Sequence, residues 1–174
     1  ATNNYVAIGE WSAGVELLES DANSFAISAA SEICFPSGFD STYELFVGVV
    51  AHSGSGGDVY RVTSDAAYYL NVDADIISLD LIDETGSTEL LAGAAASAQV
   101  YFSPDGGVNW AGSTKQPTGG SKTYVLMAAD FADSSKAFAA TSGTESAFSY
   151  TPDDGITWNQ LSLIDTALNE IIDL

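Results

Sequence analysis

The stretches SPDGGVNW at residues 103–110 and TPDDGITW at residues 151–158 follow one pattern, Ser/Thr-Pro-Asp-x-Gly-x-Asn/Thr-Trp. Proline presets φ, the aspartate side chain accepts hydrogen bonds from nearby backbone N–H groups, and glycine adopts conformations that other residues resist. The first hydroxyl can complete these hydrogen bonds, and the tryptophan can pack the turn against the next strand. The pattern therefore predicts a repeated structural turn, defined by Ser103, Asp105, Gly107, Trp110, Thr151, Asp153, Gly155 and Trp158.

This pattern resembles the Asp-box of the BNR-repeat β-propellers, the superfamily that includes sialidases and sortilin-like receptors. In those proteins the Asp-box is a folding element that lies away from the active site. The resemblance therefore implies an all-β chain folded as a β-propeller of four-stranded antiparallel blades. It also implies that Asp105 and Asp153 have a structural role and not a catalytic one.

The box recurs at the interval of a propeller blade. Two degraded copies, at residues 63–70 and 19–25, extend the series, and the spacings along Asp21, Asp65, Asp105 and Asp153 are 44, 40 and 48 residues. A four-stranded blade repeats at about 40–50 residues. We therefore expect a single domain over residues 1–174, with blade units at 1–30, 31–75, 76–118 and 119–162 and an extra inner strand within 163–174.

Each unit contains short segments rich in β-branched and aromatic residues, bounded by Gly, Ser, Asp or Pro. The expected inner strands are residues 32–35, 76–81 and 124–128. The second strands are 45–49, 90–93 and 137–140, and the third strands are 59–62, 100–102 and 148–150. No long helix is expected, and residues 40–42 and 133–135 occupy the same loop in two units.

The ends of the chain are out of phase with the repeat, since residues 5–9 match a second strand and residues 170–174 match an inner strand. In one arrangement the terminal strand completes the first unit and closes a four-bladed ring. In another the chain is a segment of a longer propeller. In a third the terminal strand pairs with another molecule by strand addition. We favour the longer propeller, because an unpaired core strand leaves an edge that needs a partner.

The charge balance narrows the possible partners. The chain carries 24 acidic and 4 basic residues, a net charge of −20 at pH 7. Such a surface repels phosphate backbones and anionic lipids, so nucleic acid is not an expected partner. Membrane insertion is not expected either, because no apolar run of about 18 residues is present. This acidic, lysine-poor composition predicts an extracellular or cell-surface protein.

The sequence offers few catalytic residues. Sialidases of the superfamily grip a carboxylate with a cluster of arginines, whereas Arg61 is the only arginine here. Lysines do not replace bidentate guanidinium groups, so sialidase activity is not expected. A glycoside hydrolase of the two-carboxylate type needs only suitably separated acids. Its candidate residues at inner-strand ends are Asp80 and Asp130, with Asp83 and Asp173 as further carboxylates.

Two features of the sequence concern metal ions and disulfides. Asp73 and Asp75 can present two oxygens on one side of a loop, which Ca²⁺ accepts, although the remaining ligands of a calcium loop are missing. They are the candidate metal ligands, and no other cofactor is expected. Cys34 is the only cysteine, so the chain forms no internal disulfide.

The function that the sequence favours is non-catalytic. We expect an extracellular or cell-surface structural or binding propeller, one that also assembles with itself through strand addition or neighbouring blades. A glycan or another protein is the expected ligand. Two alternatives stay open: a two-carboxylate glycoside hydrolase acting on neutral glycans, and a receptor-like propeller that binds peptides.

Overall fold

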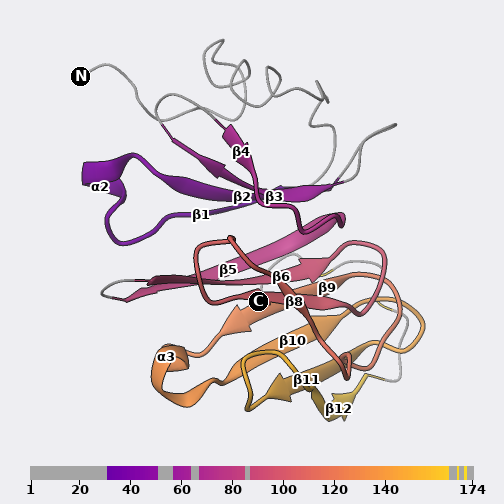
Figure 1. Cartoon of the computed structure of the whole chain (residues 1–174). Helices are drawn as coiled ribbons and strands as arrows, with labels where there is room; N and C mark the ends of the chain where they lie inside the picture. Colours follow the sequence, from indigo (N-terminus) through magenta and orange to yellow (C-terminus); the bar gives the residue numbers. More distant parts are fainter. Residues whose placement is uncertain are drawn as a thin grey trace.

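The structure is a computed structural model, and it describes residues 31–50, 57–63, 67–84, 87–164, 168 and 171. These residues form twelve strands in three four-stranded antiparallel sheets, each built from strands that follow one another along the chain. The prediction of an all-β chain is therefore confirmed. Figure 1 shows the three sheets lying one on another in chain order.

The N-terminal sheet contains four strands and a one-turn helix between the first two. They are β1 (Ser31–Cys34), α2 (Phe39–Thr42), β2 (Leu45–Val49), β3 (Asp58–Val62) and β4 (Ala67–Tyr69). The C-terminal sheet repeats this arrangement, including the helix. Its elements are β9 (Thr123–Met127), α3 (Phe131–Ser134), β10 (Ala137–Thr141), β11 (Ala147–Thr151) and β12 (Asn159–Leu163).

The middle sheet departs from this plan in one place. Its first two strands are long and pair as an extended hairpin where the other sheets have a helix. Its strands are β5 (Ile76–Glu84), β6 (Ser87–Ala94), β7 (Val100–Ser103) and β8 (Ala111–Gly112). The two helices overlap the segments 40–42 and 133–135 that the sequence placed at one common position, and each is followed by a left-handed residue, Tyr43 or Ser135.

The predicted strands lie close to the observed ones. All nine overlap an observed strand, and the inner strands predicted at 32–35 and 124–128 are displaced by one residue from β1 and β9. The three sheets fall within or next to the predicted units 31–75, 76–118 and 119–162, since β12 ends at Leu163. The unit predicted at 1–30 lies outside the described residues. Residues 64–66 of the degraded box and residues 172–174 of the extra strand lie outside them too.

Successive side chains of a strand point to opposite faces of the sheet, and the middle sheet buries apolar side chains on both faces. Against the N-terminal sheet, Ile76, Leu79 and Leu90 pack with Phe46 and Val59. On its other face, Leu91 and Val100 pack with residues of the C-terminal sheet, among them Val125, Met127, Ala139 and Trp158. The N-terminal sheet has a further buried cluster, which includes Leu45, Val47 and Tyr60.

Polar side chains join the first strands of successive sheets. Glu32 in β1 accepts a hydrogen bond at Oε2 from the Leu79 N–H of β5, at 2.8 Å. Ser78 Oγ in β5 accepts one from the Val125 N–H of β9, at 3.1 Å. Both bonds span 47 residues of sequence. The same connection therefore recurs from one sheet to the next.

Glycine permits this close approach. Gly48 in β2 and Gly93 in β6 pair with Glu32 and Ser78 respectively, so they hold the same position in their sheets. A Cβ atom at Gly93 would lie 2.0 Å from the Thr123 carbonyl oxygen of the next sheet. At Gly48 it would lie 2.7 Å from Ile76 Cγ2. The first contact is with backbone, which cannot move without separating the sheets.

The substitution Gly93→Ala tests whether this approach determines the stacking. We expect it to lower the free energy of unfolding by about 3 kcal/mol, because an overpacked backbone contact must be relieved by moving β9 away from β6. Urea unfolding of both proteins measures the difference. Gly120→Ala is the matched control, since a Cβ at Gly120 meets nothing within 4 Å. Equal midpoints for the two variants would contradict this account of the interface.

Candidate functional site

The two eight-residue stretches form the same hydrogen-bonded turn. In the second copy, Asp153 Oδ1 accepts hydrogen bonds from Thr151 Oγ1 at 2.7 Å and from the Thr157 N–H at 2.9 Å. Asp153 Oδ2 accepts a third from Thr157 Oγ1, at 2.6 Å. The Gly155 N–H donates to Thr151 Oγ1 at 3.1 Å, so the hydroxyl and the carboxylate together close the loop.

The first copy reproduces these bonds. Asp105 Oδ1 accepts from Ser103 Oγ at 2.9 Å and from the Asn109 N–H at 2.8 Å, and Oδ2 accepts from Asn109 Nδ2 at 2.6 Å. The Gly107 N–H donates to Ser103 Oγ at 2.8 Å. Gly107 and Gly155 both have positive φ, 86° and 78°. The residue types shared by the two stretches are thus the ones that the turn uses.

Each turn lies where two sheets meet. Trp158 is buried in the core between the middle and C-terminal sheets, and its Nε1–H donates to the Gly155 carbonyl at 3.0 Å. The backbone of Thr114 and Lys115, which follows β8 of the middle sheet, hydrogen-bonds to Ile156 and Trp158. Trp110 packs against the core between the N-terminal and middle sheets. The box turns therefore join neighbouring sheets as well as neighbouring strands.

The hydrogen bonds stabilise the charged form of both box aspartates. Side-chain and backbone hydrogen bonds from Asn109 hold the pKa of Asp105 below its ordinary value of 3.8. Desolvation acts to raise the pKa of Asp153, but hydrogen bonds from Thr157 and Thr151 hold it below 3.8 as well. A carboxyl group that donates a proton as a general acid must be protonated at the working pH, so its pKa has to be shifted in the opposite direction.

A groove of about 520 Å³ lies at one end of the first strands of the three sheets. Its lining comes from the segment after β1, from β5, and from β9 with the residues that follow it. The lining residues include Phe35, Ser37, Asp80, Asp83, Leu126 and Met127. In this groove, candidate carboxylates and apolar side chains share a cavity.

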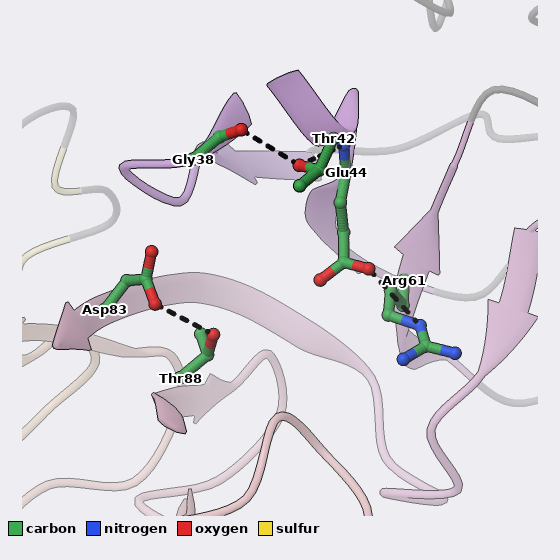
Figure 2. Close-up of polar contacts among 6 residues, drawn as sticks. All are labelled: Gly38, Thr42, Glu44, Arg61, Asp83 and Thr88. Atoms are coloured by element: carbon green, nitrogen blue, oxygen red, sulfur yellow. Dashed lines mark hydrogen bonds and ion pairs between the residues drawn. The ribbon is translucent and has the colours of Figure 1, made fainter. Parts of the chain in front are cut away.

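Both carboxylates in the groove are engaged in the fold. Asp80 Oδ2 accepts the Met127 N–H of the next sheet at 2.7 Å, and Oδ1 accepts the Leu81 N–H at 2.9 Å. Asp83 Oδ2 accepts Ser37 Oγ at 2.8 Å, and Oδ1 accepts Thr88 Oγ1 at 3.3 Å, which Figure 2 shows. Burial raises the pKa of Asp80, against the effect of its two backbone donors. Asp80 is thus a further connection between successive first strands.

The candidate carboxylate Asp130 lies outside the groove lining. Asp130 is exposed before α3, does not line the groove, and accepts Ser134 Oγ at Oδ1, 3.1 Å away. Asp173 lies outside the described residues. The structure therefore does not show Asp80 and Asp130 sharing one cavity.

The candidate metal ligands occupy a loop before β5. Asp75 Oδ1 accepts the Gly57 N–H at 2.8 Å, and Asp73 is exposed with a positive φ of 56°. In the described part of the chain, no group of three or more His, Cys, Asp or Glu side chains is placed to hold a metal ion. Calcium binding at Asp73 and Asp75 stays a prediction.

Sequence reasoning missed the role of Asp58. This buried carboxylate in β3 accepts the N–H groups of Val59, Asn71 and Val72 at 2.7, 3.1 and 2.8 Å. It thereby holds the loop that begins at Asn71, whose φ of 58° is left-handed. The signal in the sequence for this role was an aspartate at the start of an apolar strand. Glu32 and Ser78, polar residues within apolar first strands, were signals of the same kind.

The single arginine has a local role. Figure 2 shows Arg61 facing Glu44, with Nε 3.9 Å from a Glu44 carboxylate oxygen. The guanidinium also lies over the Tyr68 ring, 5.2 Å from its centroid. Arg61 does not line the groove. It is thus engaged on the surface of the N-terminal sheet and away from the groove carboxylates.

The chain matches no protein-family model, no curated protein sequence and no solved structure. Among the described residues, none of the helices has the length and apolar character needed to span a membrane.

The substitution Asp153→Ala tests the box turn. We expect a loss of about 2 kcal/mol in the free energy of unfolding, because charge-assisted hydrogen bonds from Thr151 and Thr157 lose their acceptor. Chemical denaturation gives the value. Asp154→Asn is the control, since asparagine tolerates the φ of 56° at this neighbouring position, and we expect a change within about 0.5 kcal/mol. A loss shared equally by both variants would refute the assigned role.

The pH dependence of this effect follows from the lowered pKa of Asp153. The Asp153 carboxylate binds a proton less tightly in the folded chain than in the unfolded chain, where its pKa has the ordinary value of 3.8. Its contribution to the free energy of unfolding is therefore present above pH 3.8 and is lost as the pH falls through the lower pKa of the folded chain. The stability difference between wild type and Asp153→Ala should therefore hold from about pH 7 to pH 5 and shrink below about pH 4. Denaturation curves across this pH range provide the measurement. A stability difference that stays constant at acid pH would contradict the prediction.

Proposed function

We propose that the chain is a non-catalytic structural or binding module of the Asp-box β-propeller type. The observation that carries the proposal is the engagement of its conspicuous carboxylates in structural hydrogen bonds. Asp105 and Asp153 close turns, and Asp80 connects one sheet to the next. Each is committed to backbone donors that a catalytic acid or base would have to release.

The blade-like arrangement supports the propeller part of this proposal. The three sheets have the same strand order, and their first strands, β1, β5 and β9, contact one another in sequence. The box turns occur at equivalent places between sheets. A propeller places the first strands of its blades around a central channel, and the groove lies at the ends of these three strands.

The groove supports a binding role. Apolar side chains of Phe35 and Leu126 are exposed beside the carboxylates of Asp80 and Asp83. Pockets that bind small ligands combine an apolar lining with a few polar groups that set orientation. A peptide or a glycan is the ligand class that we propose for it, in keeping with a receptor-like propeller.

The acidic composition supports an extracellular or cell-surface location. A net charge of −20 with four basic residues favours solubility and repels polyanionic partners. The few lysine and arginine residues also leave few sites for trypsin-like proteases.

The variants Asp80→Asn and Asp130→Asn distinguish a structural from a catalytic carboxylate. We expect Asp80→Asn to lower the free energy of unfolding by about 1 kcal/mol, because the amide has one acceptor oxygen for two backbone donors, and Asp130→Asn to change it little. A screen of neutral oligosaccharides should detect no hydrolysis by the wild type. Hydrolysis that either substitution abolishes without unfolding the chain would instead establish the glycoside hydrolase alternative.

A further inference from the structure

The outer face of the C-terminal sheet carries an exposed apolar patch. Leu126 in β9, Phe138 in β10 and Tyr150 in β11 lie opposite one another across three strands. Phe148, two residues before Tyr150, lies on the same face. The side chains of Leu126, Phe138 and Phe148 are 41%, 42% and 42% exposed, and Tyr150 is half-buried. We call these four residues the aromatic patch.

The patch is uncharged in a strongly acidic chain. None of the sequences TYVLM, AFAAT, AFSYT and NQLSL of β9 to β12 contains an acidic or basic residue. By contrast, β1, β3, β5 and β6 each contain at least one. In a protein with a net charge of −20, a second copy is repelled by most of the surface. At the C-terminal sheet, two copies would meet without opposing strand charges.

The equivalent faces of the other sheets are covered by the next sheet. Leu91 and Phe102 of the middle sheet occupy the row that Phe138 and Tyr150 occupy in the C-terminal sheet, opposite Asp80. Leu91 is fully buried, and Phe102 packs on Phe131 with 5.8 Å between ring centroids. The outer face of the C-terminal sheet thus corresponds to faces that pack against another sheet elsewhere in this molecule.

The C-terminal face nevertheless lacks the two features that admit a following sheet. Ser78, which accepts a backbone N–H of the next sheet, is replaced by Tyr124 at the equivalent position. Gly93, which allows the next backbone to approach, is replaced by Ala140. The alanine methyl occupies the space that this approach requires.

We propose that the aromatic patch is a homotypic interface, at which two copies of the chain pack their C-terminal sheets face to face about a two-fold axis. A two-fold contact is isologous, which means that the same patch of both copies forms the interface. An apolar and uncharged patch therefore needs no complementary charge on the other copy. Apolar patches on soluble proteins commonly mark such contacts. The inference rests on the proposed non-catalytic role and supplies that role with a partner, a second copy of this chain.

The oligomeric state of the whole chain tests the proposal. Sedimentation equilibrium over a roughly hundredfold range of concentration should show a reversible change from the monomer mass of 18.0 kDa to twice that mass. Added salt should strengthen the association, because it screens the repulsion between acidic surfaces. A chain that stays monomeric at every concentration and salt level would overturn the proposal and leave the patch to a different occupant.

The variant Phe138→Glu locates the interface. A carboxylate at the centre of the patch should weaken dimerisation by at least about a hundredfold, since a buried charge without a partner is costly. Val108→Glu is the matched control, because Val108 is 75% exposed on the first box turn, which lies between the N-terminal and middle sheets. It should dimerise as the wild type does. Dimerisation that Phe138→Glu leaves unchanged would refute the assigned surface.

Phe148→Glu provides an independent second variant, and far-UV circular dichroism establishes that each variant is folded. If Phe138→Glu fails to fold, Phe148→Glu carries the same expectation of a folded monomer. These outcomes are independent of the oligosaccharide screen. A monomeric and inactive wild type would refute the dimer and leave the non-catalytic role intact, whereas hydrolysis would refute the role itself.

Discussion

The sheet stacking depends on the hydrogen bonds that the carboxylate of each box aspartate accepts. Asp105 and Asp153 each accept hydrogen bonds from a preceding hydroxyl and a following backbone N–H, and these bonds close the turn after the third strand. The closed turn places a tryptophan into the core between two sheets. An exposed polar turn thus determines the position of a buried apolar contact.

The inner strands show how polar residues hold an apolar stack together. A row of N–H groups on the first strand of one sheet faces the preceding sheet, where Glu32, Ser78 and Asp80 accept hydrogen bonds. Unpaired backbone donors at a buried edge are costly, so these acceptors satisfy a requirement that apolar side chains cannot meet. The raised pKa of Asp80 reflects the cost of its burial. A carboxylate used in this way has little freedom to serve a reaction.

The C-terminal sheet departs from this pattern, and its departures are consistent with one another. Tyr124, Leu126 and Ala140 replace the residues that receive a following sheet, and the strands carry no charge. The same sheet exposes Phe138 and Phe148. The residues that receive a following sheet at the two described interfaces are therefore replaced at this face by other, uncharged residues.

The amino-acid sequence determined the strands and the turns, because both depend on neighbours within a few residues. Short segments rich in β-branched and aromatic residues indicated the strands. The pattern at residues 103–110 and 151–158 indicated turns whose aspartate accepts hydrogen bonds from residues within four positions. The groove, the engagement of Asp80 with Met127, and the burial of Asp58 were decided only by the tertiary structure. Asp80 and Met127 are 47 residues apart, and Asp80 and Asp130 look alike in sequence. Only the stacking of the sheets determines which carboxylate meets a backbone donor and which faces water.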